Sequence, residues 1–247
     1  MQGWLAGHLI ARRDWAPGLC TLVVEAAVEP FAPGQFVNLA LELDGVVERR
    51  SYSIASPPGA PLAFLVTEVP GGKLTPRLVR LVPGDPVLVE PKPQGFFTLK
   101  WLPPAEELWL VATGTGLGPF LSMLGSDELW DRCQRVVVVH GVRDATQLAH
   151  REDLLRLVGE RAGRLALVSA LSRGTATDDL LHGRITTLLT DGSLERAAGT
   201  PLDPARSHVM LCGNPAMIED MTNRLGERGM KKHRVRAPGH ITIEKYW

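Results

Sequence analysis

The sequence has few cysteines, no excess of charge of either sign and no long apolar run. Its three cysteines, Cys20, Cys133 and Cys212, are far apart and odd in number. Such a pattern argues against a disulfide framework and is typical of a reducing compartment, so we expect a cytoplasmic protein. Three thiolates are also fewer than the four that a plant-type iron–sulfur cluster needs. We therefore predict no cluster and no other metal site in this chain.

The charges of the sequence balance. Lysine and arginine together number 27, and aspartate and glutamate also number 27, so there is no overall basic field for nucleic acid or an anionic membrane. The longest apolar runs, such as residues 108–112 and 136–139, are far shorter than the ~20 residues that span a bilayer. The first residues lack a basic stretch followed by an apolar one, so we expect no signal peptide. We predict no binding to nucleic acid or membranes, and nothing in the sequence demands more than a monomer.

The length of 247 residues favours two domains, because a typical domain has ~100–150 residues. In the first half, short runs of strand-forming residues are separated by turns that contain proline and glycine. These runs are residues 19–28, 35–43, 46–55, 62–69 and 86–90, and a helix fits residues 74–82. Several strands at this spacing predict a small antiparallel barrel or sandwich.

The second half has a different pattern of apolar residues. Apolar runs typical of buried strands occur at residues 108–112, 136–140, 165–170 and 208–211, and a further strand-like run is 240–243. Helical segments between or after them are residues 119–129, 147–159 and 216–227. This alternation predicts βαβ units and a parallel sheet that is covered on both faces. Because the proline-rich segment 90–106 separates the halves, we predict domains at residues 1–98 and 104–247.

A glycine-rich loop follows the first of these apolar runs. Residues 113–119 read Thr-Gly-Thr-Gly-Leu-Gly-Pro and open a helical segment. Glycines let the backbone approach a phosphate, and the free N–H groups of a helix start attract anions. The match to the G-x-G-x-x-G fingerprint is incomplete, because Pro119 and Phe120 follow where its last glycine is required. Taken alone, the loop indicates either a phosphate site or a tight turn.

Two further motifs lie in the first half. Arg50-Ser51-Tyr52-Ser53 ends a predicted strand and suits a ligand with a flat ring and a phosphate. An edge strand with an alternating exposed face is the simpler interpretation of these four residues. Residues 70–75 read Pro-Gly-Gly-Lys-Leu-Thr, which is either a second phosphate cradle or a type II turn.

Five motifs in this order resemble those of bacterial ferredoxin (or flavodoxin)–NADP reductases, in the plant-type ferredoxin reductase superfamily. They are residues 50–53, 72–75, 114–119, 211–215 (Leu-Cys-Gly-Asn-Pro) and 244–247 (Glu-Lys-Tyr-Trp). The resemblance covers essentially the whole chain. It implies an FAD-binding antiparallel β-barrel followed by a Rossmann-like NADP-binding domain. It also implies hydride transfer between NADPH and flavin N5, with one-electron transfer to or from ferredoxin or flavodoxin.

The resemblance assigns FAD contacts in the first half of the chain. Arg50 would pair with the pyrophosphate, Tyr52 would stack on the flavin ring, and Ser53 would hydrogen-bond near N5. Residues 73–75 would hold the phosphates through backbone N–H groups and a threonine hydroxyl. The full set that the family implies for FAD is Arg50, Ser51, Tyr52, Ser53, Lys73, Leu74, Thr75, Thr115, Tyr246 and Trp247.

The end of the chain carries part of that set. In the subgroup that the sequence resembles, the penultimate Tyr246 lies against the flavin ring and Trp247 packs on the adenine. A pair of aromatic residues that caps the core is the alternative. Glu244 would lie near the nicotinamide and assist proton or hydride transfer. With Ser53 and Cys212, it completes the predicted catalytic set, although Cys212 alone could equally be a small buried hydrophobe.

The choice of NADP over NAD rests on arginines. The 2′-phosphate of NADP favours arginine, and Arg143, Arg173 and Arg184 stand where the family binds it. Each alone could be a solvated surface charge. The full set implied for NADP is Thr115, Gly116, Arg143, Ser172, Arg173, Arg184, Cys212, Gly213 and Asn214.

Two other functions stay open. A free-flavin reductase would share the hydride chemistry, but the Tyr-Trp ending suits tightly held FAD. A non-catalytic subunit that senses NADPH is the alternative from another class. Four basic residues in the run 231–236 are a candidate docking surface for an acidic carrier, and a solvated helix end is the simpler interpretation.

Overall fold

A computed structural model describes residues 3–173 and 179–245. The contacts divide the chain into two compact units. The first comprises Met1–Leu99 and Gly118–Asp127, and the second comprises Lys100–Leu117 and Glu128–Trp247. The helices within the described ranges include none that is long and apolar enough to cross a membrane.

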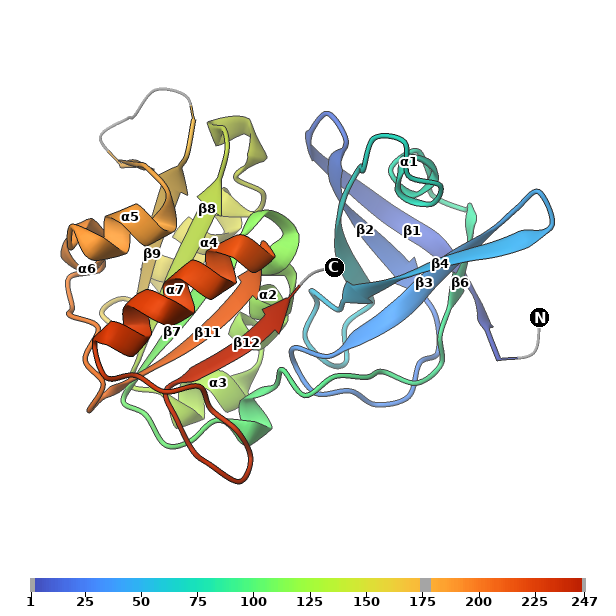
Figure 1. The fold of residues 1–247 in the computed structure, drawn as a ribbon. Coiled ribbons are helices and arrows are strands. Elements are labelled where there is room, and N and C mark those ends of the chain that lie inside the picture. The colour runs from blue at the N-terminus through green and yellow to red at the C-terminus, as the bar shows by residue number, and fades with distance from the viewer. Residues whose placement is uncertain (1–2, 174–178, 246–247) are drawn as a thin grey trace. The chain divides into compact units, whose positions relative to one another are not determined.

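The first unit is built on a six-stranded antiparallel sheet (Figure 1). Its strands are β1 (Leu5–Ala16), β2 (Leu19–Glu25), β3 (Phe36–Leu43), β4 (Val46–Ser53), β5 (Leu62–Thr67) and β6 (Pro86–Val89). Their order is β4-β3-β6-β1-β2-β5, and the two end strands also contact each other. The predicted antiparallel barrel is therefore confirmed, with a first strand, β1, that the sequence analysis did not identify.

Alternation along the strands builds the core of this unit. In β3, the side chains of Val37, Leu39 and Leu41 are buried in one apolar cluster with Leu9 and Phe64. The residues that alternate with these on β3 lie on the opposite face of the sheet, because successive side chains of a strand point to opposite sides. The apolar positions of the sequence thus decide which face of the sheet is interior.

The helix expected over residues 74–82 is shorter than predicted. Only α1 (Thr75–Leu78) is helical, and the chain continues in turns that lead to Pro83 and Gly84. Leu78 anchors the turn in the core and is fully buried. Proline cannot continue a helix, and Gly84 adopts a positive φ of 99°. The segment therefore turns into β6 after one helical turn.

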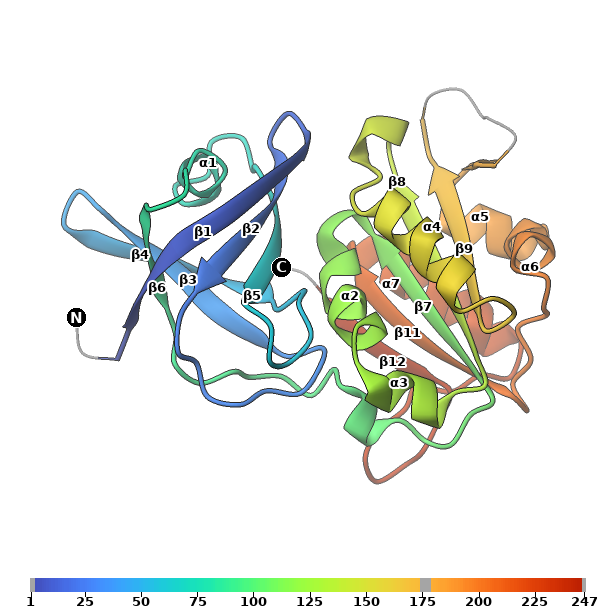
Figure 2. The same ribbon diagram turned by 180° about the vertical axis from the view of Figure 1, so that it is seen from behind.

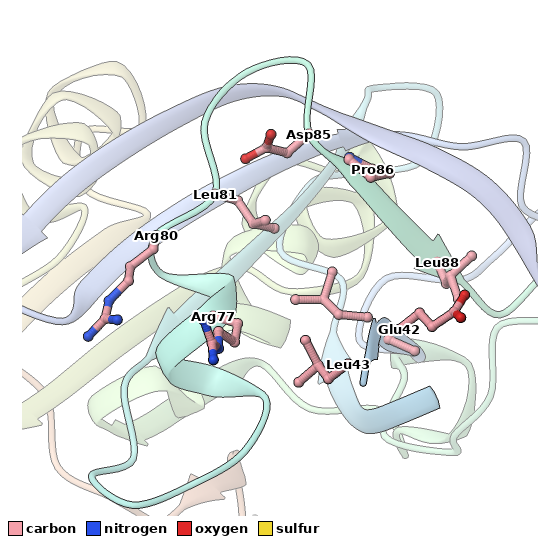
Figure 3. A pocket seen from close by; sticks show the side chains of 10 residues that line it. Glu42, Leu43, Arg77, Arg80, Leu81, Asp85, Pro86 and Leu88 are labelled. Carbon is pink, nitrogen blue, oxygen red and sulfur yellow. The ribbon is translucent and has the colours of Figure 1, made fainter. Parts of the chain in front are cut away.

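A hollow of about 550 Å³ opens beside this turn (Figure 3). Strands β3 and β6 pair only at Leu39–Val89 and Ala40–Leu88. In this register Pro86 would stand opposite Glu42, and it has no N–H to donate, so the ladder ends there. The hollow is lined by Ala40, Leu41, Glu42, Leu43, Arg77, Arg80, Leu81, Asp85, Pro86 and Leu88.

Residues 118–127 pack with the first unit. Helix α2 (Gly118–Leu124) brings Ser122 to the carbonyl of Ser56, with 2.7 Å from its Oγ to that oxygen. The rings of Phe97 and Phe120 lie 5.7 Å apart, and Gly125 packs against Pro57. A continuous helix was expected over residues 119–129, but α2 ends here and α3 (Asp127–Arg132) starts anew. A side chain at Gly125 would come within 3.0 Å of Pro57, so the break coincides with this close contact.

The second unit is a parallel sheet with helices on both faces (Figure 2). Its strands, in the order β10-β9-β8-β7-β11-β12, are β7 (Glu107–Thr113), β8 (Arg135–Val142), β9 (Leu165–Leu171), β10 (Leu181–His182), β11 (Ser207–Gly213) and β12 (Ile241–Lys245). Its helices are α3, α4 (Arg151–Glu160), α5 (Ile185–Thr190), α6 (Ser193–Ala198) and α7 (Pro215–Glu227). The expected Rossmann-like parallel sheet is confirmed.

The central strands of this sheet are buried on both faces, which explains their unbroken apolar runs. Every residue of β11 is buried, as are the first six of β7. Helices α5, α6 and α7 supply side chains to the same apolar cluster as Trp109 and Val111. The expected helix over residues 147–159 begins only at Arg151, because His150 adopts a left-handed φ of 59°. Strand β10 and helices α5 and α6 were not anticipated.

Candidate functional site

One face of β4 carries the first group of predicted site residues. The register pairs Arg50 with Leu39 and Tyr52 with Val37, so Arg50 and Tyr52 point to the same face. Tyr52 is half-buried and packs against the barrel core, and burial raises the pKa of its hydroxyl to about 12. Its hydroxyl therefore stays protonated at neutral pH, and its ring is held in place by the core.

The turn before α1 is tied to this face by an ion pair. Lys73 Nζ lies 2.9 Å from Oε1 of Glu48, which shares the face of Arg50. The side chain of Leu74 is buried in the core, and Thr75 Oγ1 accepts a hydrogen bond from the N–H of Val69 at 2.9 Å. The lysine and leucine side chains are thus engaged within the protein, which leaves backbone N–H groups as the donors that this turn can offer.

The glycines of that turn have a backbone role. Gly71 has a φ of 75°, and the N–H of Gly72 donates to the carbonyl of Val69 at 2.9 Å. With Pro70 before Gly71, this is the pattern of a type II turn. Beside it, the exposed Arg50 donates to the carbonyl of Arg49 at 2.7 Å. No carboxylate of the described residues pairs with the Arg50 guanidinium.

The two serines of the motif lie on the other face of β4. Ser51 Oγ donates to Asn38 Oδ1 at 2.8 Å, and Asn38 Nδ2 donates to Glu90 Oε2 at 2.6 Å. Ser53 is buried, with 7% of its surface exposed. This chain of hydrogen bonds fixes β4 against β3 and β6, and it positions the whole motif.

Three arginines meet at the carboxyl edge of the parallel sheet. The N–H of Arg173 donates to the carbonyl of Arg143 at 2.9 Å, so the ends of β8 and β9 stay side by side. The N–H of Gly183 donates to Leu171 at 2.8 Å, which places Arg184 next along the same edge. All three guanidinium groups are exposed, and within residues 3–173 and 179–245 none forms an ion pair. The structure therefore brings together three arginines that are far apart in the sequence.

The glycine loop packs backbone against backbone. A Cβ added at Gly116 would lie 2.5 Å from the carbonyl oxygen of Cys212, and Gly213 has a φ of 126°. Thr113 was not among the predicted site residues, yet its Oγ1 accepts a hydrogen bond from the N–H of Asn214 at 2.9 Å. The loops after β7 and β11 are thus joined at the carboxyl edge.

The amide of Asn214 begins α7. Its Oδ1 accepts hydrogen bonds from the N–H groups of Ala216 at 2.9 Å and Met217 at 3.4 Å. This is a standard N-cap with proline at the next position, and it holds Asn214 at the edge.

His140 is a second residue of this edge that the sequence analysis did not select. It is 1% exposed, and its Nε2 lies 3.1 Å from the carbonyl oxygen of Gly114. Burial lowers the pKa of the imidazole to about 4, so the ring is neutral at pH 7. The only sequence signal was a polar residue at the end of an otherwise apolar run, which alone does not distinguish a core histidine from a functional one.

Glu244 and Cys212 stand opposite each other on β12 and β11. Cys212 is fully buried. Glu244 Oε2 is buried and has no hydrogen-bond partner among the described residues, and burial raises the pKa of its carboxyl group to about 7. Tyr246 and Trp247, which were predicted to contact FAD, lie outside the described residues.

Two known reductases match this chain over all or most of its length. The flavodoxin/ferredoxin–NADP reductase of Escherichia coli (strain K12) is 43% identical over 249 residues and covers all of both chains. The ferredoxin–NADP reductase of Azotobacter vinelandii is 36% identical and covers 87% of this chain and 86% of its own. The chain belongs to the flavodoxin/ferredoxin–NADP reductase family.

Two further comparisons concern the fold. Residues 110–223 match the model of the oxidoreductase NAD-binding domain. A ferredoxin NADP+ reductase from Neisseria gonorrhoeae, solved with bound FAD and NADP, superposes with a TM-score of 0.92 at 28% identity, with all of both chains covered. The first result agrees with the parallel sheet of this reductase-family chain, and the second agrees with both its barrel and its parallel sheet.

The polar groups present suit the nucleotides that bind to such reductases. Arginines without carboxylate partners suit phosphates, and Glu244 Oε2 is a buried polar atom that lacks a partner in the described structure. Gly116 allows a close backbone approach that any side chain would prevent. Among the described residues no cluster of three or more histidine, cysteine, aspartate or glutamate side chains could hold a metal ion.

Proposed function

We propose that this chain is an FAD-dependent ferredoxin–NADP(+) reductase. The observation that carries the proposal is the full-length likeness to flavodoxin/ferredoxin–NADP reductases, at 43% identity to that of Escherichia coli. In the site itself, the arginines at the carboxyl edge of the sheet support it. We assign residues 1–98 to FAD and residues 104–247 to NADP(H).

The barrel side chains orient the flavin. FAD, when bound, exchanges a hydride with NADP(H) at its N5 atom and exchanges single electrons with a protein carrier. Arg50 neutralises a pyrophosphate charge, since its guanidinium has no carboxylate partner in the described chain. The ring of Tyr52, held by the core, offers a flat apolar face. Ser51 and Ser53 fix the strand, and Ser53 offers its hydroxyl near the reacting ring.

The turn over residues 73–75 and the end of the chain complete the FAD site in this proposal. Lys73 and Leu74 contribute backbone N–H groups, and Thr75 contributes its hydroxyl, which keeps a hydrogen to donate. Thr115, Tyr246 and Trp247 remain predicted FAD contacts.

The parallel sheet selects NADP(H). Arg143, Arg173 and Arg184, with the hydroxyl of Ser172, hold the 2′-phosphate as three charges on one edge. The residues proposed to face the nicotinamide nucleotide are Thr115, Gly116, Cys212, Gly213 and Asn214. Helix α7 starts directly after Asn214, and its first N–H groups are capped by that side chain.

Two groups beside the nicotinamide complete the catalytic set with Ser53. Cys212 is a small buried side chain that excludes water from this position. Glu244 holds a proton on its carboxyl group below about pH 7 and releases it above, because burial disfavours the carboxylate. A titration near neutral pH suits a group that moves protons.

Ferredoxin or flavodoxin is the partner that we infer, as the names of the relatives indicate for those proteins. We infer a monomer, since nothing in the sequence demands an oligomer. The wide spacing of the three cysteines, which form no disulfide among the described residues, also supports a cytoplasmic location.

An anaerobic titration tests the proposal. The purified protein is titrated with NADPH and separately with NADH, and the visible flavin absorbance is followed. We expect fast bleaching by NADPH and slow bleaching by NADH. Equal bleaching by both would contradict the 2′-phosphate assignment, and a colourless protein that binds no added FAD would leave an NADPH-sensing module instead.

Charge-matched variants sharpen that test. Replacement of Arg143, Arg173 and Arg184 by alanine should raise the KM for NADPH by roughly a hundredfold and leave that for NADH unchanged. The control replaces Lys232, Arg234 and Arg236 by alanine, which removes the same charge from the opposite edge of the sheet. Bleaching by NADPH should be unaffected in the control.

A further inference from the structure

We propose that His140 is a positioning residue for the nicotinamide nucleotide, because its hydrogen bond orients the peptide after Gly114. The inference rests on the proposed function. It assigns a role to a residue that the proposed function does not place in contact with phosphate or flavin. The buried imidazole lies in the second unit at the carboxyl end of β8, and Gly114 lies at the carboxyl end of the neighbouring strand β7.

The hydrogen bond has a defined direction. Since the Gly114 carbonyl can only accept, Nε2 of His140 must carry the hydrogen at the observed 3.1 Å. The ring is 1% exposed, so this bond is shielded from bulk solvent. Because burial lowers the pKa of His140 to about 4, the ring keeps this neutral form throughout the neutral range.

Holding this carbonyl also orients the next N–H group. A trans peptide is planar, and its C=O and N–H point in opposite directions. When the Gly114 carbonyl points at His140, the N–H of Thr115 in the same peptide therefore points away from the imidazole. That N–H belongs to the loop that the proposed function places against the nicotinamide nucleotide.

The loop needs such an anchor at this position. Gly114 adopts a φ of 54°, and glycine carries no side chain that would restrict its backbone to this conformation. Two residues later, Gly116 is fixed against the carbonyl of Cys212, where an added Cβ would lie only 2.5 Å away. The loop is thus held from β11 at Gly116, and from β8 by His140 at Gly114.

The test compares two substitutions in the FAD-loaded enzyme. His140→Leu introduces an apolar side chain of similar size that has no donor, and His140→Gln retains an N–H donor at a similar reach. We expect His140→Leu to raise the KM for NADPH about tenfold, with kcat changed less than twofold. His140→Gln should restore the KM to within about threefold of the wild type.

A ligand that does not reach the loop separates positioning from general damage. Adenosine 2′-monophosphate carries the phosphate assigned to the arginines but no nicotinamide nucleotide. Its Kd should be the same in the wild type, His140→Leu and His140→Gln. If His140→Leu does not fold, His140→Met takes its place as the variant without a donor.

Three results would overturn the inference. They are an unchanged KM in the variant without a donor, an equal rise in both variants, and a Kd for adenosine 2′-monophosphate that rises in step with the KM for NADPH. A wild-type protein that NADPH does not reduce would instead contradict the proposed function, so the two failures are distinguishable.

Discussion

The parallel sheet has an amino edge, where its strands begin, and a carboxyl edge, where they end. Each edge holds a glutamate with a buried carboxylate oxygen, and the surroundings of the two glutamates differ. At the amino edge, Glu107 Oε1 accepts hydrogen bonds from Thr200 at 2.8 Å and Arg206 at 3.1 Å, and Ser207 donates to its Oε2 at 3.4 Å. At the carboxyl edge, Glu244 Oε2 has no partner among the described residues. A fully paired group stabilises a fold, whereas an unpaired buried group costs stability and indicates a functional demand.

The largest effect that we expect is on stability at the amino edge. Glu107→Ala leaves the buried hydroxyl of Thr200 and Nη2 of Arg206 without this acceptor, and should lower the free energy of unfolding by about 3 kcal/mol. Urea denaturation of the FAD-loaded enzyme measures this. Glu106→Gln is the control, because this exposed neighbour also pairs with Arg206, at 3.0 Å, and should cost less than about 1 kcal/mol. Equal losses in the two variants would contradict the comparison.

His208, at the amino edge, shows whether a buried polar atom without a hydrogen-bond partner always indicates a functional residue. His208 Nε2 lies 2.8 Å from Thr242 Oγ1, but its Nδ1 has no partner in the described part of the chain. Burial, with smaller contributions from His233 and His240, lowers the pKa of His208 to about 3. We expect this residue to affect acid stability and not turnover.

The sign of the pH effect follows from the proton count. Between pH 6.5 and 3 the unfolded chain binds a proton at His208 that the folded chain does not. Stability is therefore full above pH 6.5 and falls at lower pH, by up to about 1.4 kcal/mol per pH unit. In urea denaturation, His208→Gln should reduce the slope of the free energy of unfolding against pH. The lowered pKa of His140 should account for the slope that remains. A change in kcat would mean that His208 is functional after all.

A smaller effect is expected on turnover at the carboxyl edge. Glu244→Gln should lower kcat at least about tenfold and remove a pH transition near 7 from the rate profile. The pKa of Glu244 is raised in the folded protein. Its contribution to the free energy of unfolding is therefore full below the ordinary pKa of a glutamate and is lost as the pH rises through about 7. The variant should therefore be more stable than the wild type above pH 7. Glu219→Gln, on the exposed side of α7, should change neither quantity.

The smallest effect concerns the basic run that precedes β12. Lys231, Lys232, Arg234 and Arg236 are exposed, and no ion pair involves them within the described ranges. Reciprocal backbone bonds between Arg234 and Ala237, at 3.0 and 2.9 Å, give the loop a hairpin form. Figure 1 shows this loop at the tail of the β12 arrow, so it belongs to the amino edge.

Replacement of these four residues by glutamine should slow carrier reduction about threefold and weaken its dependence on salt, without effect on flavin bleaching by NADPH. Stopped-flow measurements at low and high salt would show it. An unchanged rate would leave the loop as a solvated surface.

Much of the barrel could be predicted from local patterns. Strands β3, β4 and β5 appear where runs of strand-forming residues between turns predicted them, because such residues suit the surface of a sheet and proline and glycine end the runs. The helix at residues 74–82 was overestimated, since helical propensity does not register that Leu74 and Leu78 are drawn into the core. The hollow beside Pro86 depends on the pairing of β3 with β6, which are distant in the sequence.

The sequence by itself determined the order of the two domains, most of their strands and the motif residues, because these depend on local composition and on short fixed spacings. Arg50, the glycine loop and Asn214 could be identified in this way. Only the tertiary structure decided which residues meet at the carboxyl edge. His140 contacts Gly114, Thr113 contacts Asn214, and Arg143 lies beside Arg173, because parallel strands align their ends across long crossovers. The same alignment gives Glu107 its hydrogen-bond partners at the amino edge and leaves Glu244 Oε2 without one among the described residues.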